Sequence, residues 1–234
     1  MALRKGSIEI KNRILSVCVR LFLQQGYRQT PISQIIREAR VSASTFQNIF
    51  RAKDGVLREL LPVMFDGQFD AAQGLVTDEL PPLYIYAIET AIQLVLTERN
   101  ETLRDVYLEV YSMPDTAEYI LQNMAVALHR LFGARFPGAS VGDFYDMEIG
   151  SAGIMRGYMA RPCDVHFTLE KKLDCFLRLS LRAYRVSESE IEDVLAYLRK
   201  IDICAVANSV LQRLFAMLEM RFDFTLGETP HGEP

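Results

Sequence analysis

The stretch that decides the fold spans residues 26–57 and reads GYRQTPISQIIREARVSASTFQNIFRAKDGVL. Its apolar residues recur at helical spacing on both sides of residues 40–42, which predicts two short helices joined by a tight turn. Thr30 and Pro31 are expected to start the first helix and Ser42 the second. Thr and Ser can cap free amides, and Pro fits a first helical position. This pattern favours a helix-turn-helix.

A helix-turn-helix needs an apolar side that holds its two helices at a fixed angle and a polar side that can meet base edges. The residues expected on the apolar side are Ile32, Ile35, Ala39, Val41, Phe46 and Phe50, with Leu15 and Phe22 behind them. The residues left to face outward are Ala43, Ser44, Thr45, Gln47 and Asn48. Gln and Asn can pair with adenine through two hydrogen bonds, and Ser and Thr can bond to several base edges. We therefore expect the second helix to read DNA in the major groove.

Lys53 opens the next helix, where its charge and the free amides of the first turn together suit a phosphate. The complete predicted set of DNA-contacting residues is Thr30, Ser42, Ala43, Ser44, Thr45, Gln47, Asn48 and Lys53. A purely structural hairpin is the alternative, but it has little reason to place several small polar side chains in series beside a basic segment.

The charge of the chain is unevenly distributed. Residues 1–60 carry eleven Lys and Arg against four Asp and Glu, a net charge of +7, whereas residues 61–234 carry fifteen against twenty-six, a net charge of −11. A basic head on an acidic body favours contact of the head alone with a polyanion. Double-stranded DNA is the partner we expect.

Composition limits the other function classes. Half of the residues are apolar, so the chain can bury a core. No apolar run approaches the roughly 20 residues that cross a bilayer, and residues 1–10 lack the apolar core of a signal peptide, so we expect a cytoplasmic protein without a membrane partner. The four cysteines lack metal-ligand spacing, which favours free thiols and neither metal nor cofactor. We find no Gly-rich phosphate loop and no nucleophile elbow, so we do not expect an enzyme.

Helical spacing dominates the rest of the chain as well, so we expect an all-α protein. Helices are predicted to about residue 25, from about 31, over 43–49, from 53 toward 72, after Pro81-Pro82, over 101–112, 115–133, 141–160 and 168–185, and in a last helical region over 188–222. The helix after Pro82 is apolar on most sides, which is typical of the middle of a bundle. Ser187 and Glu190 form the pattern of a capping box before the last region.

Residues 10–60 resemble the tetracycline-repressor-like (TetR) family of bacterial regulators. The residues that carry the resemblance are Ile14, Leu15, Phe22, Gly26, Tyr27, Thr30, Ile32, Ile35, Ala39, Val41, Ser42, Thr45, Phe50, Lys53, Asp54 and Leu57. The resemblance implies a homodimer on a palindromic operator in a bacterial, nucleoid-associated setting. It also implies a pocket in the helical body whose ligand changes the spacing of the two DNA-reading heads.

Three positions depart from the pattern of that family. Arg40 stands in the turn and Ser44 in the second helix, where the family usually has Gly, and Gln47 stands where it usually has a Tyr that packs on backbone phosphate. Two interpretations of Gln47 stay open: the backbone clamp is weaker, or Gln47 reads a base.

The resemblance implies a division of the chain into four parts. They are a three-helix helix-turn-helix domain at 1–52, a connecting helix at 53–74, a larger helical bundle for effector binding and dimerisation at 75–226, and a flexible tail at 227–234. Small residues along one predicted helix allow close approach of a second copy. The predicted dimer interface consists of Gly150, Gly153, Gly157, Phe176 and Leu177.

Amphipathic or polarisable side chains in the helical body are the candidates for an effector pocket, because an apolar cleft with a few polar groups suits a small hydrophobic ligand. They are Tyr84, Tyr107, Tyr111, Met124, His129 and Tyr158. The sequence thus favours a homodimeric repressor that a small-molecule effector releases from DNA. The alternative is a DNA-bound adaptor whose body docks a protein partner and senses no small molecule.

Overall fold

The computed structural model describes residues 2–76 and 81–227 of the chain. These residues form α-helices and one 3-10 turn but no β-strand, so the predicted all-α fold is confirmed. The helices are α1 (Ala2–Gln25), α2 (Ile32–Ala39), α3 (Ala43–Phe50), α4 (Lys53–Gln73), α5 (Leu83–Arg99), α6 (Glu101–Val110), α7 (Pro114–Phe132), α8 (Val141–Ala160), α9 (Leu169–Ala183), α10 (Glu188–Leu198) and α11 (Ile203–Met217), with the 3-10 turn η1 (Gly133–Arg135) after α7.

The last predicted helical region is divided in the structure. It forms two helices, α10 and α11, and the chain leaves helical geometry after Met217 instead of continuing to 222. Asp202 explains the break, because its side chain accepts a hydrogen bond from the Ala205 amide at 3.0 Å and so caps a new helix. The capping box of Ser187 and Glu190 is present at the start of α10, as predicted.

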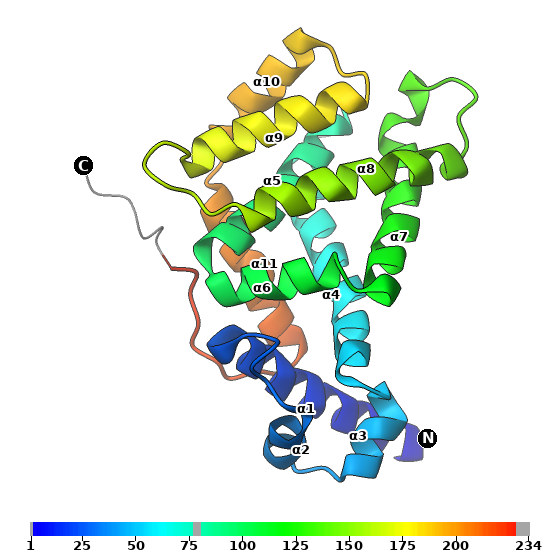
Figure 1. The fold of residues 1–234 in the computed structure, drawn as a ribbon, viewed down its shortest axis with the longest axis vertical. Coiled ribbons are helices and arrows are strands. Elements are labelled where there is room, and N and C mark those ends of the chain that lie inside the picture. Colours follow the sequence, from blue (N-terminus) through cyan, green and yellow to red (C-terminus); the bar gives the residue numbers. More distant parts are fainter. Residues whose placement is uncertain (1, 77–80, 228–234) are drawn as a thin grey trace.

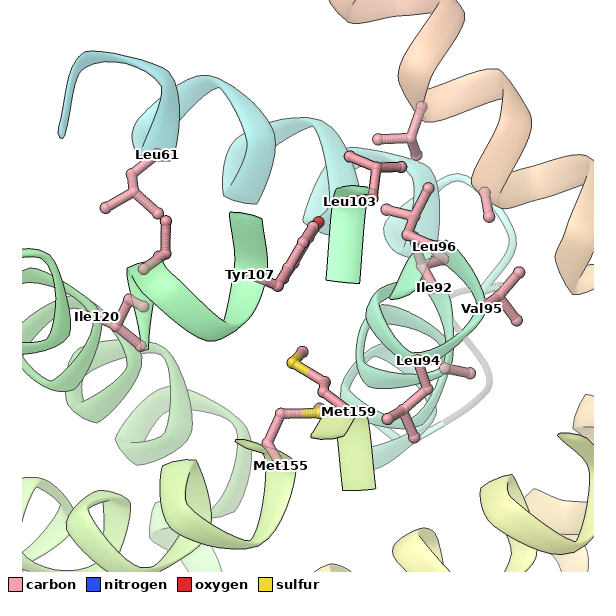
Figure 2. Close-up of a cluster of buried hydrophobic side chains, with 14 of the residues drawn as sticks. Leu61, Ile92, Leu94, Val95, Leu96, Leu103, Tyr107, Ile120, Met155 and Met159 are labelled. Carbon is pink, nitrogen blue, oxygen red and sulfur yellow. The ribbon is translucent and has the colours of Figure 1, made fainter. Parts of the chain in front are cut away.

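Helices α1–α3 lie together at one end of the molecule, and α4 runs from this head into the helical body (Figure 1). In the body, α5 is surrounded by α4, α6, α8, α9, α10 and α11. Its residues are buried from Leu83 to Glu98 with the sole exception of Ile85, which agrees with the prediction of a central helix. Figure 2 shows Ile92, Leu94, Val95 and Leu96 of this helix pointing to different sides.

A buried ion pair ties three parts of the body together. Glu98 of α5 and Lys172 of α9 form it, with side-chain exposures of 3% and 0%. Lys172 also donates to the Arg161 carbonyl at 2.6 Å, and the Cys163 amide donates to Glu98 at 3.0 Å. Because both charges have further hydrogen-bond partners, the pair is well satisfied despite its burial.

The head is joined to the body by α6 and by the segment after α11. Thr102 of α6 donates to the Leu23 carbonyl at 2.8 Å, and Arg28 pairs with Glu109. In the C-terminal segment the Leu218 carbonyl accepts from the hydroxyl of Ser16 in α1 at 2.7 Å. Beyond it, two stacked rings pack against α11; they belong to Phe222 and Phe224, and their partner is Phe215. Except for Gly227, the predicted tail at 227–234 lies outside the described residues.

Candidate DNA-binding surface

The three helices of the head are held by one apolar core. Ile14 of α1, Ile35 and Ala39 of α2 are fully buried, and Phe46 and Phe50 of α3 are 2% and 4% exposed. The rings of Phe46 and Phe50 lie 5.5 Å apart and anchor α3 by one side only. The opposite side of α3 is therefore left at the surface.

One residue expected in this core lies outside it. Ile32 is 37% exposed at the first position of α2, because the helix turns its buried side toward α1 three residues later, at Ile35. Val41 is half-buried in the turn.

Ser42 starts α3 as predicted. Its hydroxyl oxygen accepts from the Thr45 amide at 3.0 Å and lies 2.8 Å from the hydroxyls of both Ser44 and Thr45. Capping by Ser satisfies one of the free amides of the first turn and fixes where the helix begins. The three hydroxyls are thus connected to one another at the N-terminal end of α3.

The outer face of α3 is polar and accessible. Ala43, Ser44, Gln47 and Asn48 are exposed, and Thr45 is half-buried. A short helix that buries two Phe rings and exposes Gln and Asn along the other side has the form needed to enter a major groove.

Thr30 does not play the predicted part. It is fully buried, and its hydroxyl donates back to the Gly26 carbonyl at 2.8 Å. The residue preceding α2 is Pro31, and no side chain caps this helix. The predicted cap is therefore wrong, and the hydroxyl of Thr30 faces the protein interior and not a DNA surface.

The side chain of Lys53 is not free to contact a DNA phosphate, as the sequence predicted it would be. Its ammonium group donates to the carbonyl oxygens of Tyr27 and Thr30 at 2.8 and 3.1 Å and lies 4.1 Å from the centre of the Tyr27 ring. Partial burial lowers the pKa of Lys53. The Tyr27 hydroxyl in turn donates to Asp54 at 2.6 Å. These contacts fasten the start of α4 to the loop before α2, so Lys53 positions the head in this structure.

The junctions on either side of α3 use unusual backbone conformations. Arg40 in the turn and Arg51 after α3 have φ values of 52° and 60°, a region that favours Gly. At the second junction, a Cβ atom added to Gly55 would lie 2.0 Å from the Phe50 carbonyl oxygen. This link between α3 and α4 therefore requires Gly at position 55.

Exposed basic side chains surround α3. Arg40 and Arg51 are exposed at its two ends, and the side chain of Arg37 on α2 is 73% exposed. Two other basic residues of the head form ion pairs within the protein: Arg20 pairs with Glu38 at 2.5 Å, and Arg28 pairs with Glu109. Arg37 itself lies 3.9 Å from Glu38, so Arg40 and Arg51 are the charges best placed to meet a DNA backbone beside an inserted helix.

The structure does not bring the predicted effector residues to one place. Tyr107 of α6 is buried, Tyr111 just after α6 is half-buried, and Met124 lines a groove between α4 and α7. The other three lie apart: Tyr84 packs on Tyr197, Tyr158 packs on Phe176, and His129 contacts the Ala139 carbonyl. Sequence reasoning missed the buried polar residues beside Tyr107 and Tyr111, which are Gln68, Glu89, Gln93 and Glu148.

The predicted dimer residues fall into two groups. Gly150, Gly153 and Gly157 are exposed along α8, and a Cβ atom on any of them would meet nothing within 4 Å. Phe176 and Leu177 are fully buried within the chain. They cannot contact a second copy in this conformation, so their assignment to the interface is wrong; their apolar side of α9 faces the core.

No helix in the described part of the chain is long and apolar enough to span a membrane. Within the same residues no group of three or more His, Cys, Asp or Glu side chains gathers as metal ligands do.

Comparison with protein families gives one match. Residues 14–60 match the model described as bacterial regulatory proteins, tetR family. The matched range contains the second half of α1, all of α2 and α3, and the first turns of α4. Neither the curated proteins nor the solved structures contain a significant match.

Proposed function

Since its helix-turn-helix is that of the tetR family, the chain is a DNA-binding transcriptional regulator of this family, and we propose that it represses transcription as a homodimer on a palindromic operator. The observation that carries the proposal is the exposed face of α3, where Gln47 and Asn48 stand opposite the buried Phe46 and Phe50. Two such heads related by a twofold axis would read two equal half-sites.

The outer face of α8 supports the homodimer. Gly150, Gly153 and Gly157 follow one another at helical spacing on this face, and Ile149 beside them is 55% exposed. An apolar residue among glycines lets a second helix approach closely. The interface we propose therefore consists of α8 without Phe176 and Leu177.

Release by an effector is supported by the way the head is attached. Helix α6 carries Tyr107 into the interior and contacts the head through Thr102 and Glu109. Helix α4 carries Gln68 into the same region and begins beside α3. A ligand that binds between these helices and prefers one head spacing would shift the population toward it. The groove between α4 and α7, with a volume of about 480 Å³, offers space for a small ligand beside these helices.

The test compares base reading with a matched change elsewhere. The operator, selected from random duplex DNA, is expected to be an inverted repeat. Gln47→Ala should weaken binding to it by about 1–3 kcal/mol and relax the choice of base at one position per half-site. Gln24→Ala on the exposed surface of α1 is the control, and it should change neither the operator affinity nor the choice of base. Equal loss on every base variant of the operator would contradict the assignment of Gln47 as a base reader.

A further inference from the structure

Two carboxyl groups lie in the interior of the helical body without a basic partner. Glu89 of α5 and Glu148 of α8 are 0% and 4% exposed. Each raises the energy of the other's charged form, and no Lys or Arg in the described residues acts on either carboxyl. Buried carboxyl groups are normally paired or fully hydrogen-bonded. These two therefore call for a partner of opposite charge.

The hydrogen bonds around Glu89 leave acceptors without donors. Gln93 donates to Glu89 Oε1 at 2.6 Å and accepts from the Tyr111 hydroxyl at 2.9 Å. Gln68 donates to the Tyr107 hydroxyl at 2.6 Å. Two buried oxygens, Glu89 Oε2 and Gln68 Oε1, have no partner among the described residues. Gln68 Oε1 is an acceptor, and Glu89 Oε2 is one when its carboxyl group is ionised, so a molecule that completes the site in that state has to donate hydrogen bonds.

We name these side chains the buried carboxyl cluster; its members are Gln68, Glu89, Gln93, Tyr107, Tyr111 and Glu148. Tyr184 adds a contact from the end of α9, where its hydroxyl lies 3.5 Å from Glu148. Tyr86 of α5 packs edge-on against the Tyr184 ring at 5.6 Å. Aromatic rings attract cations through their faces, so the surroundings of the carboxyl groups suit positive charge.

Hollows border the cluster on the side of α4 and α7. An open hollow of about 170 Å³ between α7 and α8 is lined by Tyr111 and Ile120 and, on the exposed side of α8, by Gly153 and Arg156. Ile120 also lines the groove of about 480 Å³ between α4 and α7. Phe65 lines that groove and a small void beside Tyr107. Figure 2 shows Tyr107 and Ile120 in this part of the core, with Leu61. None of these hollows is lined by Glu89, Glu148 or Gln68, so a ligand that reaches the cluster from the groove has to displace the side chains between them.

The groove has an apolar floor and an acidic rim. Phe65, Phe69 and Tyr119 line it, and Asp66 and Asp70 lie along its edge on successive turns of α4. Arg130 of α7 faces it as well, so the charges at the mouth are two acidic and one basic. Such a groove admits an apolar body and favours a positive charge on it.

We propose that the buried carboxyl cluster binds an organic cation, an amine carried on an aromatic or aliphatic body, which enters through the groove between α4 and α7. The amine donates to Glu89 Oε2 and Gln68 Oε1, and its charge is balanced by Glu89 and Glu148. The proposal rests on the proposed effector-responsive function and names the chemical class of the effector.

The probes are a series of ω-phenylalkylamines with two to six methylene groups and the matching ω-phenylalkanols, titrated by calorimetry at pH 7.5. At least one amine is expected to bind ten times or more tightly than its alcohol. Glu89→Gln should abolish that preference, whereas Glu101→Gln, which makes the same change at an exposed position of α6, should preserve it. Alcohols that bind as tightly as the amines, no binding by any amine, or equal behaviour of the two variants would overturn the proposal.

A second measurement needs no variant. Burial raises the pKa of Glu89 to about 7 and that of Glu148 to about 8. The other titratable groups that face them are phenols whose pKa values are raised too, so they stay protonated; these are Tyr86, Tyr107, Tyr111 and Tyr184. Binding of an amine should therefore release protons from the carboxyl groups, measured as a dependence of the binding enthalpy on the ionisation enthalpy of the buffer. Binding without proton release would contradict the assignment.

The same samples separate this proposal from the proposed function. Operator binding is measured by anisotropy with and without the amine. Normal operator binding with no amine binding would overturn only the cation site. Tight amine binding that leaves operator affinity unchanged would retain the cation site and overturn release by an effector.

Discussion

Arg40 holds the turn of the helix-turn-helix in a conformation that costs free energy for a residue with a Cβ atom. Its φ and ψ are 52° and 51°, in the left-handed region. Two backbone hydrogen bonds fix it there, since its amide is bonded to the carbonyl oxygens at the end of α2. The strain comes from the arginine at this position and not from the geometry of the turn, because Gly would adopt the same φ and ψ without strain.

Arg40→Gly should therefore stabilise the folded protein by about 0.5–1 kcal/mol, measured by urea denaturation. The control is Arg37→Gly, an exposed helical position of α2, where the same replacement should destabilise by about 1 kcal/mol. A loss of stability in Arg40→Gly as large as in the control would show that the turn is not strained.

Glu89 gives the stability of the protein an unusual pH dependence. Its pKa is raised from an ordinary 4.5 to about 7 by burial, so at intermediate pH the folded chain holds a proton that the unfolded chain has released. The free energy of unfolding should then fall as pH rises from about 5 to about 7, and Glu148 should extend the fall to about pH 8. Glu89→Gln should flatten this profile, measured by urea denaturation at several pH values. A steeper profile in Glu89→Gln would contradict a protonated Glu89.

At the scale of the element, the link between α3 and α4 is the tightest point of the head. The carbonyl of Phe50 approaches Gly55 so closely that a methyl group there has no space, and the contact is with backbone, which cannot rotate away. The orientation of α3 relative to α4 thus depends on one missing side chain.

Gly55→Ala should destabilise the protein by about 1–3 kcal/mol and weaken operator binding, because α3 has to shift. Gly67→Ala tests the same replacement about three turns later in α4, where the new Cβ atom would lie at an ordinary 3.8 Å from Val210. It should stabilise by up to about 1 kcal/mol, since Ala favours helix over Gly. Thermal unfolding and operator titration of both variants check the difference.

The elements that the sequence predicted well are those with local signals. The cap at Ser42 and the capping box at Ser187 mark their helices correctly, because these contacts join residues three apart. Two predictions were wrong for different reasons. At Thr30 one local contact replaces another, because its hydroxyl donates to the Gly26 carbonyl and does not cap α2. The prediction for Phe176 needed tertiary information, because α5 and α8 pack on α9 and bury this residue.

The buried carboxyl cluster could be anticipated only in part. Glu89 and Gln93 stand four residues apart in a helix that is apolar on most sides, so a shared buried face was readable from the sequence. That Gln68 and Glu148 lie close to these two residues could not be read from the sequence, because it depends on how α4, α5 and α8 pack against one another. Long-range packing of this kind leaves no periodic signal in a single sequence.

At the scale of the whole molecule, in the dimer that we propose, the exposed glycines of α8 hold the two heads together. Gly153→Arg should leave the monomer folded, because no atom lies within 4 Å of the new Cβ position. It should convert the proposed dimer to a monomer in sedimentation experiments. The affinity for the operator should fall at least tenfold when the dimer is lost, since one head alone reads only half of the site.

Gln122→Arg on the exposed surface of α7 adds the same charge away from α8 and is the control. It should remain a dimer with unchanged operator affinity. A Gly153→Arg variant that stays dimeric would place the interface elsewhere.

The hydrogen bond between Ser16 and Leu218 has a consequence for biosynthesis. Leu218, which accepts the hydrogen bond from Ser16 of α1, is synthesised more than two hundred residues after the start of α1. A nascent chain can build its three-helix head early and can contact α6 through Thr102 and Glu109 once these residues have emerged, but the bond from Ser16 to Leu218 forms only after translation has passed Leu218. Chains interrupted before that point would hold the head by its α6 contacts alone.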